Sequence, residues 1–325
     1  MATERDITTA VDVLRRGGLV AFPTETVYGL GCDAENRDAL RRLYTVKRRP
    51  AGHPVIVHLA NVAALPAWAA EVPSAARSLA DACWPGPLTL VLKRAERVPD
   101  DATGGRDTVA LRVPDQRVAL ALLERFDGGI AAPSANRFGR VSPTTAEHVR
   151  ADLGDDVDIV LDDGPCRVGV ESTIVDCTGE RPAILRLGAV SREQVEGLVG
   201  PVDLRVQGEV AAPGTMAAQY APHARVEVVE AAHVSVRAAT LLAGGARVGL
   251  LAIDAPPDVP PEVVMLEHPH DVEQFAHVLY ERLRAADRLG LDVLLTVPPP
   301  AVGLGAAVTD RLQRAAAGAS VSATP

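Results

Sequence analysis

The fold is decided by residues 17–31, which read GGLVAFPTETVYGLG. Two glycines precede the apolar run from Leu19 to Thr24, and Pro23 lies near its end, which is typical of a short buried β-strand. Apolar residues recur at helical spacing before this run, over residues 7–16, and after it, over residues 38–46. A short strand between two amphipathic helices predicts an α/β fold.

The same alternation continues through the first two hundred residues. We expect further strands at 55–59, 88–93, 109–113, 130–132, 158–161, 172–176 and 183–187, and helices at 75–82, 117–125 and 145–153. Thr144 with Glu147, and Ser191 with Gln194, have the spacing of capping boxes at helix starts. An irregular stretch, not a helix, joins the second and third of these strands, which favours an open, twisted mixed sheet over a purely parallel one.

A second, smaller domain is expected after a break in the periodicity. Residues 201–224 are too long and too rich in proline and glycine for a regular element, so we predict a linker there. Strand patterns at 226–229, 248–253 and 293–297 then alternate with helical patterns that end near residue 242 and cover 272–289 and 306–316. The predicted organisation is a first domain over 1–200 and a parallel α/β, Rossmann-like domain over 225–325, which has no glycine-rich phosphate motif.

Composition excludes several classes of protein. With 325 residues, 47% of them hydrophobic and 23% charged, the chain can bury two cores and is neither disordered nor fibrous. A net charge of −9 argues against wrapping nucleic acid through overall charge. No segment approaches the roughly 18 apolar residues of a membrane span, so we expect a cytoplasmic protein without a membrane partner. The four cysteines form no C-x-x-C pair, which predicts free thiols and no metal cage built by the protein.

Polar side chains follow the first strand where it ends. Thr24, Glu25 and Thr26 are placed to face a ligand, because open α/β sheets bind ligands at the carboxyl ends of strands. A polar turn without a ligand explains the same residues equally well.

A compact basic patch follows, since residues 37–50 hold six Arg or Lys and one Asp. In an extended segment Lys47 and Arg49 would project to the same side, which suits the binding of phosphate oxygens. The alternative is a solvated helix end whose cations are favoured by the helix dipole.

Two later segments also contain side chains that can bind anions. Alternation over 108–113 places Thr108 and Arg112 on one face of a strand, where Arg112 needs an anionic partner, either a ligand carboxylate or an internal acid. Ser134, Asn136 and Ser142 lie ahead of a marked helix start, which is a natural anion site. Ordinary turn chemistry explains each of these three residues singly, although not their gathering beside two arginines.

Five motifs together resemble the threonylcarbamoyl-adenylate synthase family. They are PTETVYGLG at 23–31, Lys47-x-Arg49, WPGPLT at 84–89, APSANR at 132–137 and VGVEST at 168–173, and their order and spacing match as well. Ala212-Pro-Gly and Tyr220-Ala-Pro, followed by a small α/β domain, are similar to the two-domain type. The resemblance implies an enzyme that makes L-threonylcarbamoyladenylate and pyrophosphate from L-threonine, bicarbonate and ATP with Mg²⁺. This product feeds the modification of the tRNA adenosine next to the anticodon through a downstream tRNA threonylcarbamoyl transferase complex, and a direct tRNA contact stays open.

The resemblance also implies site residues. Its threonine pocket falls on Thr26, His58, Arg112, the backbone near Ala132, and Ser172. Its ATP contacts fall on Lys47, Arg49, His53, Thr108, Ser134, Asn136, Ser142, Arg186 and Tyr220. Lys47 and Arg49 would act catalytically by holding the triphosphate and stabilising the departing pyrophosphate, and no general base is implied.

The chain departs from the family pattern at three places, and it leaves two rival functions open. The family usually has Lys-Gly-Arg, Asn-Pro and a His before the linker Tyr, where this chain has Lys47-Arg-Arg, His53-Pro and Gln219. We expect the linker to lie over the nucleotide as a lid. A hydrogenase-maturation carbamoyltransferase is disfavoured because C-x-x-C pairs are missing. A noncatalytic RNA-binding module using the basic patch around Lys47 is disfavoured by the negative charge and by the 3% of aromatic residues.

Overall fold

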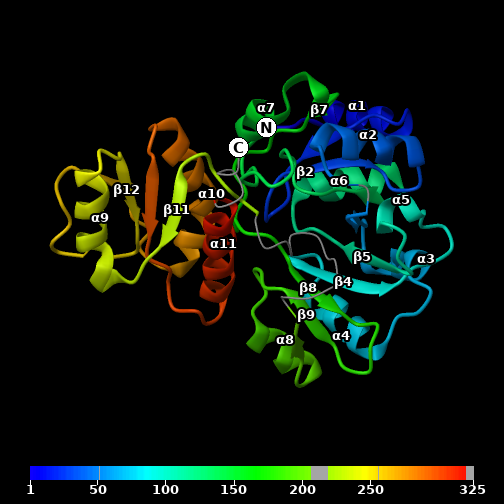
Figure 1. The fold of residues 1–325 in the computed structure, drawn as a ribbon. Helices are drawn as coiled ribbons and strands as arrows, with labels where there is room; N and C mark the ends of the chain where they lie inside the picture. Colours follow the sequence, from blue (N-terminus) through cyan, green and yellow to red (C-terminus); the bar gives the residue numbers. More distant parts are fainter. Residues whose placement is uncertain (51, 206–218, 255, 320–325) are drawn as a thin grey trace. The chain divides into compact units, whose positions relative to one another are not determined.

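The computed structural model describes residues 1–50, 52–205, 219–254 and 256–319 (Figure 1). The chain forms two compact units, one made of residues 1–138 and 142–215, the other of residues 139–141 and 216–325. Most of the expected linker, namely residues 206–218, lies outside the described residues.

The first unit is built on an open mixed sheet, as the sequence predicts. Its strand order in the described part is β10-β9-β8-β4-β5-β3-β6-β2-β1-β7. Neighbours β1/β7, β3/β5, β4/β8 and β9/β10 are parallel, and the other pairs are antiparallel. The bounds are β1 (Val20–Phe22), β2 (Gly29–Asp33), β3 (Ile56–His58), β4 (Leu88–Lys93), β5 (Thr108–Arg112), β6 (Ile130–Ala131), β7 (Ile159–Val160), β8 (Thr173–Asp176), β9 (Ala183–Arg186) and β10 (Asp203–Leu204).

The sequence patterns did not predict strand β2, because its glycines read as turn residues. A side chain at Gly31 would place its Cβ 2.7 Å from both Phe22 and Ile130. Glycine is therefore needed here so that β2 can approach its neighbours β1 and β6 closely. A glycine-rich stretch that looks like a loop thus forms an interior strand.

Helices α1 (Glu4–Arg15), α2 (Arg37–Lys47), α4 (Ser74–Cys83), α6 (Arg117–Phe126) and α7 (Ala146–Leu153) confirm the expected helices within a few residues. The first unit also contains α3 (Leu65–Trp68), α5 (Asp100–Thr103), α8 (Arg192–Val199) and the 3-10 turns η1 (Val62–Ala64) and η2 (Gly154–Asp156). The capping box of Ser191 and Gln194 is confirmed at the start of α8. The expected box at Thr144 is wrong by one residue, because Thr145 is the N-cap of α7 and accepts a hydrogen bond from the His148 amide.

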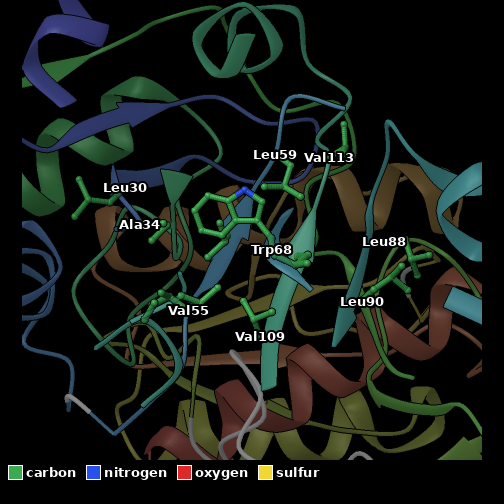
Figure 2. Packing of buried hydrophobic residues seen from close by; sticks show 14 of the residues in the cluster. Leu30, Ala34, Val55, Leu59, Trp68, Leu88, Leu90, Val109 and Val113 are labelled. Atoms are coloured by element: carbon green, nitrogen blue, oxygen red, sulfur yellow. The ribbon is translucent and has the colours of Figure 1, made fainter. Parts of the chain in front are cut away.

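Among the described residues, apolar clusters lie on both faces of the sheet. On one face, side chains of α2, α3 and α4 pack on alternate strand residues, and Trp68 lies among Leu30, Ala34, Val55 and Val109 (Figure 2). On the other face, α1 and α6 pack against β1 and β6. A third, small cluster consists of strand residues alone, one from each of β3, β4, β5, β8 and β9: Ile56, Val91, Ala110, Ile174 and Leu185. We call it the strand cluster.

The second unit contains a separate parallel sheet, which confirms the expected Rossmann-like architecture. Its strand order is β11-β14-β12-β13, with bounds Arg225–Val228, Val293–Thr296, Val248–Leu251 and Val264–Met265. The helices are α9 (Val234–Ala243), α10 (Val272–Arg288) and α11 (Leu304–Ala319), and η3 (Ala231–His233) precedes α9.

Residues 139–141 belong to this second unit, although the sequence-based boundary places them in the first domain. Arg140 forms a β-bridge with Ala221, and the Gly139 carbonyl accepts a hydrogen bond from the Ala221 amide. The guanidinium of Arg284 donates to the Val141 carbonyl at 2.6 Å. Such backbone pairing could not be read from the sequence because its two sides are about eighty residues apart.

Gly129 offers a test of the packing under Trp68. A Cβ at this position would lie 2.4 Å from the Trp68 ring and 2.7 Å from Val57, so we expect Gly129→Ala to lower the free energy of unfolding by about 2 kcal/mol. Gly197→Ala is the matched control, because its Cβ meets open space within α8 and should raise that free energy by about 0.5–1 kcal/mol. Both tryptophans lie in the first unit, so their fluorescence in urea reports its unfolding. Equal midpoints for the two variants would contradict the packing described.

Candidate active site

The site is built on the strand cluster face of the sheet. Strands β3 and β5 are parallel, and His58 pairs with Arg112 in their register. Since side chains alternate, His58 shares a face with Ile56, and Arg112 shares one with Ala110, which are both members of the strand cluster. His58 and Arg112 therefore lie at the carboxyl ends of neighbouring parallel strands, where α/β sheets bind ligands.

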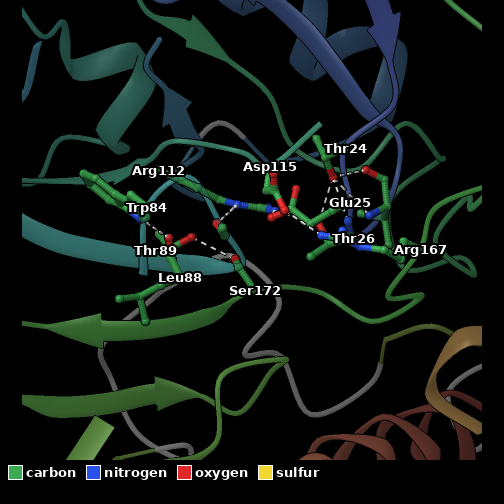
Figure 3. A network of polar contacts seen from close by, with 12 residues as sticks. Thr24, Glu25, Thr26, Trp84, Leu88, Thr89, Arg112, Asp115, Arg167 and Ser172 are labelled. Atoms are coloured by element: carbon green, nitrogen blue, oxygen red, sulfur yellow. Dashed lines mark hydrogen bonds and ion pairs between the residues drawn. The ribbon is translucent and has the colours of Figure 1, made fainter. Parts of the chain in front are cut away.

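Arg112 is paired with an internal acid, which is one of the two partners that the sequence allows. Its Nη2 lies 2.7 Å from Oε1 of Glu25, and the exposed fractions of the two side chains are 4% and 1% (Figure 3). The guanidinium also donates to Thr26 Oγ1 at 3.0 Å and to the Gly86 carbonyl at 3.2 Å. An unpaired guanidinium at this depth would be costly, so Glu25 neutralises the buried charge.

The three polar residues of the turn before β2 have different partners. Thr24 stabilises the turn itself, since its hydroxyl donates to the Val27 carbonyl at 2.6 Å and accepts from the Thr26 amide at 3.2 Å. Thr26 and Glu25 instead contact Arg112. Thr24 therefore fits the polar-turn interpretation, whereas Glu25 and Thr26 contact a buried arginine, and their facing a ligand stays a prediction.

Ser172 connects the two predicted sets of residues. Its hydroxyl lies 2.8 Å from that of Thr89, and Arg186 donates to this hydroxyl at 2.9 Å and to the Ser172 carbonyl at 2.8 Å. Next to it, the carboxylate of Glu171 accepts a hydrogen bond from Ser142 at 2.7 Å. A residue predicted to bind threonine thus contacts one predicted to bind ATP.

Glu25, Thr89 and Glu171 are the members of this network that the resemblance did not assign. Each of them lies inside one of the five motifs quoted above. Their position within these motifs could have marked them as candidate site residues. Which side chains contact one another could not be predicted, because this depends on the register of the sheet.

Lys47 and Arg49 lie close to the predicted ATP residues, but their backbone differs from the expectation. The assumption of an extended segment is wrong, because Lys47 ends α2 and Arg48 adopts a left-handed conformation with φ of 54°. The solvated helix end is wrong for Lys47 and Arg49, whose exposed fractions are 1% and 9%, but it fits the exposed arginines of the patch, Arg37, Arg41, Arg42 and Arg48. The Lys47 ammonium donates to the carbonyls of Ser134 and Asn136, at 2.5 and 2.6 Å.

Phe138 brings Arg49 and His53 beside Lys47. Its amide donates to the Lys47 carbonyl at 2.8 Å, and its ring meets the His53 ring edge-on with centroids 5.4 Å apart. The Arg49 guanidinium lies 5.6 Å from the centre of the same ring and donates to the Pro54 carbonyl at 2.7 Å. These contacts gather cations around a loop whose Ser134 and Asn136 side chains are joined at 2.5 Å.

The remaining predicted residues lie apart from these contacts. Thr108 begins β5, on the same face as Arg112 but four residues before it, and is half-buried. The amide of Ala132 donates to the Ile56 carbonyl at 2.9 Å, which fixes the backbone there. Tyr220 belongs to the second unit, where it stacks on Tyr280 and lies under Arg311. Its role toward ATP stays a prediction.

Burial changes the proton affinity of the basic groups. Desolvation, with help from the charge of Arg49, holds the pKa of Lys47 well below its usual value. Desolvation and the charge of Arg112 lower the pKa of His58 to about 3, so its imidazole is neutral at pH 7. Desolvation lowers the pKa of His53 as well. A neutral imidazole can donate a hydrogen bond to a substrate through one ring nitrogen and accept one from it through the other.

Metal ligands do not gather anywhere in the part of the chain that the structure describes. Within residues 1–50, 52–205, 219–254 and 256–319, no three His, Cys, Asp or Glu side chains come together as a metal site would require. Searched over the same ranges, no helix combines the length and apolar character needed to cross a membrane.

Comparisons with known proteins show which family and which fold the chain shares. A family model described as "Telomere recombination" matches residues 12–188, and one described as "Threonylcarbamoyl-AMP synthase, C-terminal domain" matches residues 190–317. The chain is 42% identical to a threonylcarbamoyl-AMP synthase of Pyrococcus abyssi, over 96% of this chain and 94% of the relative. It is 38% identical to one of Bacillus subtilis, over 96% and 93%. The crystal structure of P. abyssi Sua5 complexed with L-threonine superposes with a TM-score of 0.92 at 41% identity, over 98% of this chain and 96% of that one.

The class of protein is therefore a two-domain α/β enzyme, and each of its two domains matches a family model. The chain belongs to the threonylcarbamoyl-AMP synthase family, and the resemblance found in the sequence is confirmed.

The low pKa of His58 makes the first unit sensitive to acid. Between pH 6.5 and about 3 the unfolded chain binds a proton at this imidazole that the folded chain does not, so stability falls as the pH is lowered through this window. At pH 5 the loss amounts to about 2 kcal/mol relative to pH 7. Urea unfolding followed by tryptophan fluorescence at both values tests this, with His58→Gln as the control. If the variant loses as much stability as the wild type, His58 is not the group responsible.

Proposed function

We propose that this chain makes L-threonylcarbamoyladenylate and pyrophosphate from L-threonine, bicarbonate and ATP. The observation that carries the proposal is the contact of Arg186 with Ser172, which joins the residues expected around threonine to those expected around ATP. The family membership and the threonine-bound relative support the same substrates. A nucleotide and an amino acid must lie side by side for this reaction, and proximity then supplies much of the rate.

In the proposed reaction, an oxygen of the threonine carbamate attacks the α-phosphorus of ATP and pyrophosphate leaves. Lys47 and Arg49 would stabilise the negative charge that develops on the leaving group. Their present acceptors are backbone carbonyls, at Ser134, Asn136 and Pro54, which phosphate oxygens could replace. A neutral acceptor holds a cation less strongly than an anion does, so the Lys47 ammonium could exchange its two carbonyl acceptors for phosphate oxygens.

Mg²⁺ would neutralise charge on the phosphate oxygens when bound together with ATP. The Glu171 carboxylate and the Ser142 hydroxyl are oxygen donors of the type that Mg²⁺ takes alongside phosphates.

The product would be consumed by a transferase complex that modifies the tRNA adenosine next to the anticodon, and we propose a cytoplasmic location because ATP and tRNA are supplied there. The rival function, RNA binding through the basic patch around Lys47, fits the structure less well. Lys47 and Arg49 are buried and donate to backbone carbonyls, so an RNA backbone would have to meet the exposed arginines on α2 and Arg48 directly after it.

Pyrophosphate release tests the proposed function directly. With ATP, Mg²⁺ and bicarbonate, we expect release that depends on L-threonine and is roughly ten-fold or more slower with L-serine, which lacks one methyl group. Without an amino acid, release should fall to background. Equal release in all three mixtures would show that the chain does not activate threonine.

Arg49 tests the role assigned to the buried cations. Arg49→Ala should lower pyrophosphate release by about 10²-fold, because a preorganised positive charge is lost next to the leaving group. Arg41→Ala is the control, since Arg41 lies on α2 two turns before Arg49 but is exposed and pairs with Asp38 and Asp101. Circular dichroism and urea midpoints verify that both variants fold. Unchanged activity in folded Arg49→Ala would exclude the proposed role.

A further inference from the structure

We propose that Glu25 binds the α-ammonium group of the amino-acid substrate, so that Glu25 and Arg112 together form a receptor for a zwitterion. This inference rests on the proposed function and names a specificity-determining residue for it. The sequence allows a ligand carboxylate as a partner of Arg112, and the resemblance places Arg112 in the threonine pocket. No residue has so far been assigned to the ammonium group at the other end of the same molecule.

The carboxylate of Glu25 has unused hydrogen-bonding capacity. It lies 2.7 Å from Arg112, yet neither of its oxygens accepts an aligned hydrogen bond from any residue in the described part of the chain. An ionised carboxylate offers about four acceptor sites, and leaving them unfilled in a buried place is costly. The Glu25 side chain is 1% exposed, so bulk water does not fill them. An ammonium group, with three donors, matches this deficit.

The backbone on both sides of Glu25 is fixed, which keeps its carboxylate aimed. The Glu25 carbonyl accepts a hydrogen bond from the Val168 amide at 2.8 Å. Thr24 and Thr26, its two neighbours, have hydroxyl groups 2.8 Å apart (Figure 3). Thr26 in turn accepts from Arg112. The acid and the base thus belong to one rigid network, as a site that recognises a small ligand requires.

Charge balance favours a zwitterion over a simple anion. The buried pair of Glu25 and Arg112 is neutral as a whole, and a zwitterionic amino acid adds no net charge when it enters. A ligand with a carboxylate and no ammonium would bring one uncompensated negative charge next to Glu25, which a buried site penalises strongly. Glu25 would therefore reject hydroxy acids and oxo acids that Arg112 alone would accept.

A divalent cation is the other ligand that could use the Glu25 oxygens. The structure favours the ammonium, because over the described ranges no further His, Cys, Asp or Glu joins Glu25 to form a metal-ligand group. Threonine binding measured without Mg²⁺ and ATP distinguishes the ammonium from the metal. If Glu25 bound a metal, replacing Glu25 would leave the affinity for threonine unchanged under these conditions.

The test compares two ligands by isothermal titration calorimetry on the full chain, without ATP or Mg²⁺. L-threonine is one, and the other is 2,3-dihydroxybutanoate of matching configuration, in which a hydroxyl replaces the ammonium. The wild type should bind L-threonine at least ten-fold more tightly than the analogue. In Glu25→Gln the dissociation constant for L-threonine should rise at least ten-fold, while that for the analogue stays the same or falls. Glu25→Asp, which keeps the charge at a shorter reach, should weaken threonine binding several-fold and leave the analogue unaffected.

Two results would overturn the proposal. If Glu25→Gln lowers the affinity for both ligands equally, Glu25 only orients Arg112. If Glu25→Gln lowers the affinity for neither ligand, Glu25 does not face the substrate. If Glu25→Gln fails to fold by circular dichroism, the same two comparisons apply to Glu25→Asp. Pyrophosphate release by the wild type tests the proposed function independently. If this release depends on threonine but Glu25→Gln keeps the wild-type preference for threonine over the analogue, only the role of Glu25 is refuted. A wild type that neither binds threonine nor releases pyrophosphate removes both.

Discussion

The buried ion pair between Arg112 and Glu25 is the interaction on which the arrangement of the site depends. A guanidinium inside an α/β sheet is tolerated only where an anion neutralises it, and here that anion comes from the turn that follows β1. The pair therefore ties the end of β5 to the turn before β2, two segments that are not neighbours in the sheet order. With Arg112 fixed, Thr26 and the carbonyl of Gly86 take up defined positions around it.

The opposite half of the site uses a different solution for its cations. Lys47 donates to two backbone carbonyls and Arg49 donates to a third, and a carbonyl is a weaker acceptor for a cation than a carboxylate is. One half of the site is thus neutral in itself, while the other half carries charge that burial makes costly, as the depressed pKa of Lys47 reflects. This asymmetry suits a pair of substrates of which one is a zwitterion and the other a polyanion.

Much of the fold could be predicted from local sequence, because strands such as β4 and helices such as α10 have clear periodicity and ends. The candidate site residues came from the family resemblance. Interior strand β2 could not be predicted, since its glycines permit close packing that only the neighbouring strands reveal. Motif residues Arg112, Ser172 and Lys47 could be named, but not their partners. The contact of Arg112 with Glu25, or of Lys47 with two carbonyls, follows from register and chain reversal over many residues, which no local pattern encodes.

The excursion of residues 139–141 limits how separable the two halves of the chain are. The polypeptide passes between the units three times, after residues 138, 141 and 215, so the second unit is not a simple appendage at the carboxyl terminus. Its short inserted piece is flanked directly by Phe138 and Ser142, which contact Arg49 and Glu171 respectively. If the protein were shortened to its first unit, residues 139–141 would lose their hydrogen bonds with Ala221 and Arg284. The first unit is therefore not an independent module, because one of its loops is completed by residues of the second unit.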